Sequence, residues 1–292
     1  MGEYVDLIKV IQNNFNQLSK GHKLIAEFIM NEYDKAAFMT AASLGEAVGV
    51  SESTVVRFAN TLGYDGYREL QRELQELIKN KLTTVQRISL SKDFSDYEKA
   101  LKMAIRKDIN NIEKTLNELD YQAFQEAVEL ILKAENVFVL GLRSSSFLAE
   151  YLGFYLNFLL DNVKIVTPGA SDVFEQLLKA TEKDVIIGIS YPRYSKRTLE
   201  ALDYGKQKGC KIIGITDSLI SPAAQYSDTT LIASSNMISF VDSLVAPMSL
   251  INALIIAIGT EKQEDTTARF KELESIWKKH SVYDYNNNNN EK

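Results

Sequence analysis

The 292-residue chain has little cysteine, histidine and proline, and it contains no long apolar run. One cysteine, Cys210, cannot form an internal disulfide, which is typical of proteins kept in a reducing cytosol. With only His22 and His280 beside it, no Cys/His zinc spacing exists, and we predict neither a metal site nor a cofactor. The longest apolar stretches, 185–190 and 244–258, are shorter than the ~18–20 residues of a transmembrane helix, so no membrane-spanning protein is expected.

The N-terminus also lacks the marks of a secretory signal. The segment MGEYVDLIKVIQNN has neither a basic n-region nor an apolar h-region, so we expect a cytoplasmic protein without membrane contacts. The formal net charge of −6 argues against nucleic acid as a partner, because phosphate binding usually leaves a basic footprint. Residues 1–80 carry eight basic and eleven acidic side chains, so the first part of the chain is not basic either.

The distribution of proline and of apolar residues divides the chain into two parts. All four prolines lie beyond residue 167, and up to about residue 133 the apolar residues recur at helical spacing. Short β-rich apolar runs then alternate with amphipathic segments of helical length; these runs are 137–141, 163–166, 185–190, 211–216 and 229–233. The pattern predicts an all-α domain followed by an α/β domain, with a five-stranded parallel sheet and helices on both faces.

The segment 40–63, TAASLGEAVGVSESTVVRFANTLG, has the pattern of a helix-turn-helix. Thr40 can cap a first helix, Gly49 and Val50 form a tight turn, and Ser51 can cap a second helix. That second helix places its apolar residues on one face and small hydroxyls, an arginine and an asparagine on the other. Such side chains suit a helix in the DNA major groove, and the DNA-binding candidates are Ser51, Ser53, Thr54, Arg57 and Asn60. An ordinary helical hairpin with a solvated polar face has the same pattern.

Two loops of the predicted sheet have the residues of an anion site. In an open parallel sheet, ligands bind beyond the carboxyl ends of the strands, where loops meet helix N-termini. Residues 141–146, GLRSSS, follow the first strand, and residues 190–198, SYPRYSKRT, follow the third. Both loops are rich in hydroxyls and contain arginine, which favours a phosphate cradle formed by Arg143, Ser144, Ser145, Ser190, Arg193, Ser195 and Thr198. Helix capping is the alternative role for these hydroxyls, and we favour it for Asp217 and Ser218 after the fourth strand.

Two helical segments predict self-association. The segments 147–160 and 244–258 are apolar on more than one face, which is more than the surface of a monomer usually tolerates. A homodimer or a higher homo-oligomer is therefore expected, although a deep core position of either helix would give the same pattern.

Both parts of the chain carry motifs of one protein family. The run SESTVVRFANTLGYDGYRELQREL followed by GLRSSS and ISYPRYSKRT resembles the RpiR (MurR/RpiR) family of bacterial transcription regulators, over about residues 15–260. The resemblance implies a DNA-binding domain joined to a flavodoxin-like SIS (sugar isomerase) domain that binds phosphosugars. The sequence departs from the family's S-x-S-G-x-T loop, with Pro192 at the second Ser and Arg193 at the Gly, and Arg143 replaces a small residue. The ligand is then held by guanidinium groups, is a different phosphorylated or acidic metabolite, or is absent from this pocket.

Together these features predict five segments. They are a helix-turn-helix DNA-binding domain at 1–80, a helical connector at 81–120, a SIS phosphosugar-sensing domain at 121–260, a C-terminal helix at 261–282 and a disordered Asn-rich tail at 283–292.

The leading functional hypothesis is a regulator of carbohydrate-metabolism genes that binds a double-stranded DNA operator and a phosphosugar effector. A phosphosugar isomerase with a helical appendage is the alternative, but the α/β domain has no histidine. Only Glu150, Asp172 and Glu175 could then transfer a proton. A helical adaptor that binds only protein is a third class. The acidity implies that DNA binding needs a dimer, matched half-sites and low to moderate salt, with basic residues gathered on one side: Lys20, Lys23, Arg57, Arg72, Lys79, Lys81 and Arg87.

Overall fold

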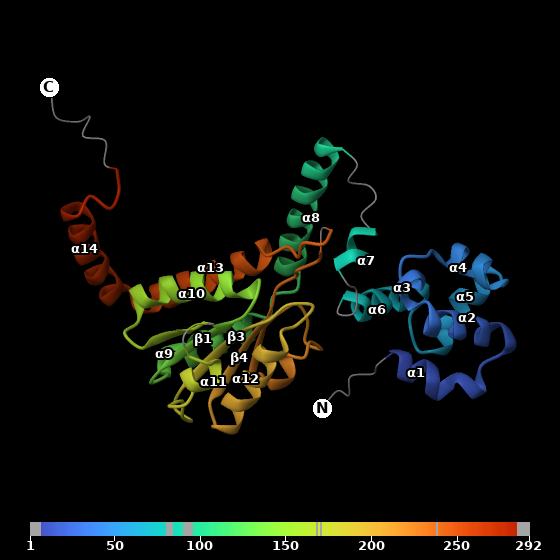
Figure 1. Ribbon diagram of the computed structural model, residues 1–292, viewed down its shortest axis with the longest axis horizontal. Coiled ribbons are helices and arrows are strands. Elements are labelled where there is room, and N and C mark those ends of the chain that lie inside the picture. The colour runs from blue at the N-terminus through green and yellow to red at the C-terminus, as the bar shows by residue number, and fades with distance from the viewer. Residues whose placement is uncertain are drawn as a thin grey trace. The chain divides into compact units, whose positions relative to one another are not determined.

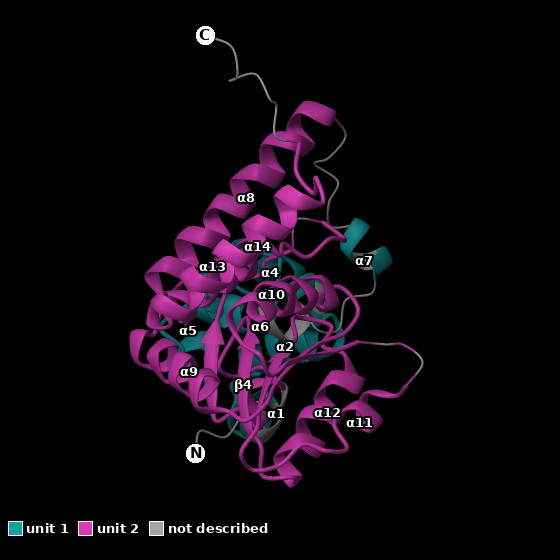
Figure 2. Cartoon of the chain, turned by 90° about the vertical axis from the view of Figure 1, so that its left-hand side faces the viewer, with its two compact units in different colours: residues 1–92 teal, residues 93–292 magenta. Residues whose placement is uncertain are grey.

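A computed structural model describes residues 7–79, 84–89, 96–167, 169, 171–237 and 239–284 of the chain. The chain divides into two compact units, residues 1–92 and 93–292, which Figure 2 colours separately. Of the predicted disordered tail, residues 285–292 lie outside the described residues. No single described helix is both long enough and apolar enough to cross a membrane.

The first unit is helical throughout its described part, as the sequence predicts (Figure 1). A short α7, Thr84–Ser89, lies in the segment 81–120 for which the sequence predicts a helical connector. The preceding elements are α1 (Leu7–Asn14), the 3-10 helix η1 (Phe15–Gln17), α2 (Lys20–Asn31), α3 (Tyr33–Ala36), α4 (Ala41–Val48), α5 (Glu52–Thr61) and α6 (Tyr67–Lys79).

The core of this first unit forms around α5. Val55, Phe58 and Ala59 are fully buried, and α5 packs against α2, α4 and α6. Polar side chains of α6 then fix the chain that follows α3, because Tyr67 Oη donates to the Met39 carbonyl at 2.9 Å and Gln71 Nε2 donates to the same oxygen at 2.8 Å. The pair of helices α4 and α5 is therefore supported by α2 and α6.

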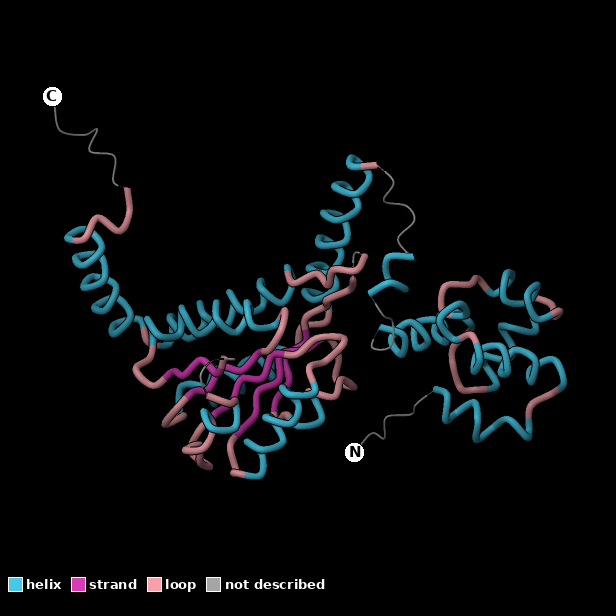
Figure 3. The backbone as a smooth tube through the Cα atoms, in the orientation of Figure 1, coloured by secondary structure: helices cyan, strands magenta, loops and turns pink. Residues whose placement is uncertain are grey.

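The second unit contains a five-stranded parallel sheet in the order β2-β1-β3-β4-β5 (Figure 3). Every strand begins at the residue that the apolar runs predict, and β3 and β5 end one residue earlier. The strands are β1 (Val137–Gly141), β2 (Val163–Val166), β3 (Val185–Ile189), β4 (Lys211–Thr216) and β5 (Thr229–Ile232). The helices are α8 (Tyr97–Asn117), α9 (Tyr121–Lys133), α10 (Ser145–Leu159), α11 (Val173–Gln176), α12 (Lys196–Gln207), α13 (Val245–Glu261) and α14 (Gln263–Lys279), with a 3-10 turn η2 (Ala224–Tyr226).

Two hydrophobic layers cover the sheet, one on each face. Along β1, Val137 and Val139 pack into a cluster with residues of α9, α10 and α13, whereas Phe138 and Leu140 pack into a cluster with residues of α11 and α12. This alternation follows from the two-residue period of a strand. The predicted α/β architecture with helices on both faces is confirmed, and α10 and α12, which follow β1 and β3, lie on opposite faces.

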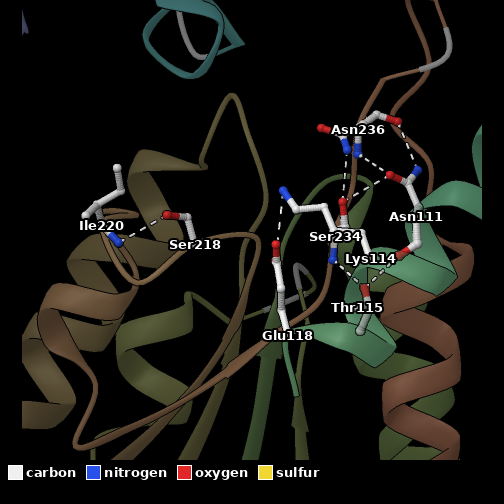
Figure 4. A network of polar contacts seen from close by, with 8 residues as sticks. All are labelled: Asn111, Lys114, Thr115, Glu118, Ser218, Ile220, Ser234 and Asn236. Atoms are coloured by element: carbon white, nitrogen blue, oxygen red, sulfur yellow. Dashed lines mark hydrogen bonds and ion pairs between the residues drawn. The ribbon is translucent and has the colours of Figure 1, made fainter. Parts of the chain in front are cut away.

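A buried polar network fixes α8 to the loop that follows β5 (Figure 4). Asn111 Oδ1 accepts from Ser234 Oγ at 3.1 Å and from the Asn236 backbone N–H at 3.2 Å, while Asn111 Nδ2 donates to the Asn236 carbonyl. One turn further on, the Ser234 backbone N–H donates to Thr115 Oγ1 at 2.8 Å. These bonds join residues more than 115 positions apart in sequence, so α8 belongs to the second unit.

Cys210 provides a test of the core. Its side chain is buried, Sγ donates to the Thr181 carbonyl at 3.1 Å, and burial raises the pKa of the thiol to about 11. Because this pKa lies above its unfolded value, the stability that the neutral thiol contributes is present below about pH 9 and is lost as the pH rises through 11.

We predict that a disulfide reagent at pH 8 leaves the native thiol unmodified and reacts with one thiol per chain in urea. Stoichiometric reaction of the folded protein would contradict this burial.

Candidate functional site

The helix-turn-helix forms through the caps that the sequence indicates. Thr40 Oγ1 accepts from the Ser43 backbone N–H at 3.1 Å and starts α4, and Ser51 Oγ accepts from the Thr54 backbone N–H at 3.3 Å and starts α5. Between them, Gly49 has φ +75°, a left-handed conformation that glycine adopts without steric cost. The turn is thus set by residues within twelve positions of one another, which explains why the sequence alone locates it.

Hydroxyl groups gather at the N-terminus of α5. Ser51 Oγ lies 2.9 Å from Ser53 Oγ and 2.8 Å from Thr54 Oγ1. Arg57 Nε donates to the Ser53 carbonyl at 3.3 Å, so its side chain runs back along the helix toward these hydroxyls. Ser51, Ser53 and Arg57 are exposed, and Thr54 is half-buried. The structure therefore brings four of the five DNA-binding candidates together at one exposed helix end, where N–H groups, hydroxyls and a guanidinium can face a phosphate or a base edge.

Asn60, the fifth candidate, has a structural contact that the sequence analysis missed. Its Oδ1 accepts from the Gly66 backbone N–H at 3.0 Å and so closes the turn between α5 and α6. Only its Nδ2 group is then left to donate outward. The proximity of Asn60 to the glycine-containing turn at 63–66 was the signal that could have indicated this role.

The predicted basic face of the first unit is only partly formed. Lys20 and Arg72 are exposed, but Arg87 is buried with 1% of its surface exposed, so its assignment to that face was wrong. Lys81 and the side chain of Lys79 lie outside the described part of the chain. His22 packs edge-on to Phe58 with ring centroids 5.6 Å apart, and its pKa is lowered by burial and by the nearby charge of Arg57.

In the second unit, the two candidate loops follow adjacent strands at the same edge of the sheet. Gly141 at the end of β1 pairs in register with Ile189 at the end of β3. The chain leaves β1 for one face of the sheet and β3 for the other, so the loops flank the point where the strand order reverses. A Cβ atom at Gly141 would lie 2.5 Å from the Ser145 carbonyl oxygen, so glycine is needed for α10 to begin this close to the strand.

Each loop contains an arginine in a backbone conformation that favours glycine. Arg143 has φ +59° and Arg193 has φ +68°; among the described non-glycine residues, only Ser281 shares a positive φ. This conformation costs an L-residue about 1–2 kcal/mol. Both arginines are exposed. Each loop backbone thus has a left-handed residue of the kind that glycine usually provides, and in each loop that residue carries a guanidinium group.

The hydroxyls of these loops differ in their roles. Ser195 Oγ accepts from the Thr198 backbone N–H at 3.3 Å and caps α12, whereas Ser145 and Ser190 are buried and Ser144 is exposed. Thr198 Oγ1 is buried and has no hydrogen-bond partner. Helical side chains tilt toward the helix N-terminus, so this hydroxyl is directed to the loop edge, where a ligand oxygen could pair with it.

Tyr191, Tyr194 and Asp217 complete this edge and were not among the predicted site residues. Tyr194 Oη donates to Asp217 Oδ1 at 2.8 Å, which ties the loop after β3 to the loop after β4. The buried Tyr191 hydroxyl has no hydrogen-bond partner, and burial, followed by the charge of Asp217, raises its pKa well above the usual value. Both tyrosines lie inside the segment 190–198, which was the available signal. Asp217 therefore links two loops, while Ser218 Oγ accepts locally from the Ile220 backbone N–H at 3.2 Å.

Two of the three carboxylates that were candidates for an isomerase have other partners. Asp172 and Glu175 form a reciprocal cap at the start of α11, and Asp172 also pairs with Arg197. The hydrogen bond from the Phe174 backbone N–H, together with Arg197, holds the pKa of Asp172 below its usual value. Glu150 is exposed on α10. Within the described ranges, no three His, Cys, Asp or Glu side chains are grouped so that they could hold a metal ion.

Comparison with known proteins matches both units. Residues 5–81 match the helix-turn-helix domain of the rpiR family, and residues 130–257 match the SIS domain. Over 285 residues the chain is 26% identical to an uncharacterized HTH-type transcriptional regulator of Haemophilus influenzae, which covers 93% of this chain and 96% of that protein.

Two solved structures share the fold. The sugar isomerase domain of the RpiR transcription factor from Sphaerobacter thermophilus has a TM-score of 0.56 and 31% identity, covering 59% of this chain and 96% of that domain. The Vibrio vulnificus NanR protein complexed with ManNAc-6P has a TM-score of 0.56 and 18% identity, covering 93% of this chain and 97% of that protein.

The left-handed backbone at Arg193 yields a stability prediction. Arg193→Gly should change the free energy of unfolding by less than about 1 kcal/mol, because relief of strain offsets the greater entropy of the unfolded chain. Arg193→Val should lower it by about 1–2 kcal/mol, because a branched side chain fits this conformation poorly. At Lys271, exposed on the regular helix α14, Gly should instead be the worse of the two. Urea unfolding of the four variants gives the order, and equal effects of Gly and Val at position 193 would contradict it.

Proposed function

Because this chain belongs to the rpiR family of helix-turn-helix proteins and carries a SIS domain, we propose that it is a cytoplasmic, sequence-specific regulator of carbohydrate-metabolism genes. Its effector is a phosphorylated sugar or a related acidic metabolite. The proposal rests on two features that occur in one chain. One is an exposed cluster of hydroxyls and an arginine on a helix-turn-helix, and the other is a pair of arginine-containing loops where the strand order of a parallel sheet reverses.

The first unit supplies the DNA-binding function. In a helix-turn-helix, the N-terminal residues of the second helix contact base edges while neighbouring groups bind phosphates. The cluster formed by Ser51, Ser53, Thr54 and Arg57 lies at that end of α5. Asn60 can add an amide donor, because its Oδ1 is bonded to the Gly66 backbone N–H and its Nδ2 group remains to donate. The partner is a double-stranded DNA operator.

The second unit supplies the effector site. A phosphate group at the β1–β3 edge would face the N-termini of α10 and α12, the hydroxyls of Ser144, Ser145, Ser190 and Thr198, and the guanidinium groups of Arg143 and Arg193. NanR, which shares the fold, is complexed with ManNAc-6P, a phosphorylated sugar. Ser195 acts through its cap on α12, which holds the Thr198 hydroxyl at the loop edge.

A regulatory role is favoured over isomerase activity by the contacts of the acidic groups. Ring opening and enolisation need an acid/base group of suitable pKa at the ligand. Asp172 and Glu175 are engaged in the α11 cap, and the pKa of Asp172 is lowered, which makes it a weaker base. Asp172 and Glu175 are thus committed to the cap and to the ion pair with Arg197 and do not form a free proton-transfer pair.

A homodimer follows from the apolar residues that α10 and α13 leave uncovered. Helix α10 packs on the sheet and on α13, yet Phe147, Phe154 and Ile256 on these two helices stay more than half exposed. A second copy would cover them and would present two helix-turn-helix units to two half-sites. Residues 1–80 carry more acidic than basic side chains, which makes this pairing important, because one DNA-binding domain alone has few phosphate contacts.

The recognition helix can be tested with Arg57→Ala. Loss of this guanidinium should weaken binding to a selected operator about 5- to 100-fold, the effect of one good base or phosphate contact, and should leave the fold intact. Arg68→Ala, at an exposed position of α6, removes the same charge and serves as the control. Fluorescence anisotropy at several salt concentrations measures both variants. Equal affinity of the Arg57→Ala variant and the wild type would remove α5 as the DNA-reading helix, and absence of salt-sensitive DNA binding by the wild type would favour a protein adaptor.

The effector site can be tested with the double variant Ser144→Ala/Ser190→Ala. It should abolish the response of DNA binding to the effector while leaving DNA binding itself unchanged, because one hydroxyl is removed from each loop. Ser249→Ala/Thr267→Ala is the control, since these hydroxyls bond to carbonyls of their own helices. A panel of sugar phosphates supplies the effector, and the same panel is assayed for aldose–ketose interconversion. A double variant that still responds would place the site elsewhere, and turnover at ordinary enzyme rates would favour the isomerase.

A further inference from the structure

Helix α8 carries an apolar stripe that nothing in the second unit covers. Its members are 37% exposed at the least and 66% at the most, and they are Leu101, Ile105, Ile109, Ile112 and Leu116. Five large apolar side chains on one 21-residue helix are an unusual surface for a protein in water. We call this set the α8 stripe.

The α8 stripe is distinct from the face that attaches α8 to the second unit. The attached face contains Asn111 and Thr115, which bond to the loop after β5, and Asp108, which accepts from Ser243 Oγ at 2.5 Å. Each residue of an α-helix advances by about 100°, so Ile105, Ile109, Ile112 and Leu116 lie beside this face, and Leu101, seven residues before Asp108, lies where the two faces meet. Helix α8 therefore has two adjoining faces. One bonds to the rest of the second unit, and the other is apolar, exposed and free to contact a partner.

The spacing of the stripe is that of a helix pair. Ile105, Ile109, Ile112 and Leu116 follow one another at intervals of four, three and four residues, which is the a/d repeat of paired helices. The exposed Leu119, three residues further on, continues the repeat just beyond the end of α8. Side chains at this spacing interlock with a second helix that has the same spacing, and a second copy of α8 offers it.

We infer that α8 pairs with α8 of a second copy of this chain, in antiparallel orientation. Charges beside the stripe decide the orientation. Arg106 and Glu113 are both exposed and lie seven residues apart on the same side of the stripe. In an antiparallel pair, a two-fold axis passes between Ile109 and Ile112. Arg106 of each copy then faces the partner's Glu113, which gives two opposite-charge contacts.

The pairing extends the dimer face of the proposed function, on which it rests. Helix α13 packs against both α8 and α10, so the α8 stripe and the exposed residues Phe147, Phe154 and Ile256 belong to three helices that are in contact. The stripe alone is too small for a stable dimer and adds to that face.

The antiparallel pairing also determines where the connecting segments begin. Tyr97, at the start of α8, lies about 13 residues from the two-fold axis, so the two copies of this residue would be about 40 Å apart at a rise of 1.5 Å per residue. The helix pair would thus set the separation of the two chain segments that lead to the DNA-binding units.

Cysteine cross-linking tests the inference in the full-length protein, because native Cys210 is buried. Ile105→Cys and Leu116→Cys are prepared as separate chains, mixed, and treated with a mild oxidant. The antiparallel pair predicts a disulfide between the two different chains and none within either variant alone, since each position lies about 16 Å from its own symmetry mate. Cross-links of each variant to itself would show a parallel pair, and no cross-link in any mixture would overturn the pairing.

Charge reversal provides a second measurement. Arg106→Glu should weaken the dimer about 3- to 10-fold in sedimentation equilibrium, and addition of Glu113→Arg in the same chain should restore it, because the double variant pairs opposite charges again. Lys271→Glu on α14 is the matched control. Failure of the restoration overturns the assigned orientation. A protein that is dimeric and binds its operator but fails both tests overturns only the α8 pairing, whereas cross-linked dimers without operator binding overturn the proposed function.

Discussion

The parallel direction of the five strands is the constraint on which the second unit depends. Parallel strands cannot be joined by short hairpins, so each connection crosses a face of the sheet and returns the chain to the same starting edge. All loops that follow strands then lie at the opposite edge, together with the N-termini of the helices they begin. Residues of β1 alternate between two apolar layers, which shows that both faces are buried. The polar residues of this unit consequently gather where the strands end.

The reversal of strand order next to β1 makes one part of that edge different from the rest. There α10 and α12 leave on opposite faces, so their first residues are not blocked by a neighbouring crossover. Arg143 and Arg193 stand there in a left-handed conformation. In the family pattern these positions hold a small residue and a glycine, so the backbone course is kept while the side chain changes. A charged group at a position that costs backbone strain is more easily explained by ligand binding than by folding.

The acidity of the chain bears on how it would bind DNA rather than on whether it does. The α5 cluster contributes hydroxyls and a single guanidinium, and Arg87, which looked available in the sequence, is buried. Fewer phosphate contacts mean a weaker sequence-independent attraction and a greater dependence on two half-sites bound at once. Under the proposed function, DNA binding would therefore depend on dimer geometry, and the exposed apolar surfaces of α8, α10 and α13 are the surfaces that would define it.

The sequence by itself determined the features that depend on neighbouring residues: the starts of all five strands, the caps Thr40 and Ser51, and the turn at Gly49. Apolar periodicity, capping hydroxyls and glycine act over a few positions, so their effect can be read from a short segment. Only the tertiary structure decided the contacts between distant segments, such as Asn111 with Ser234 and Tyr194 with Asp217, and the burial of Arg87. These depend on which elements pack together, and a side chain's sequence neighbours do not specify that choice.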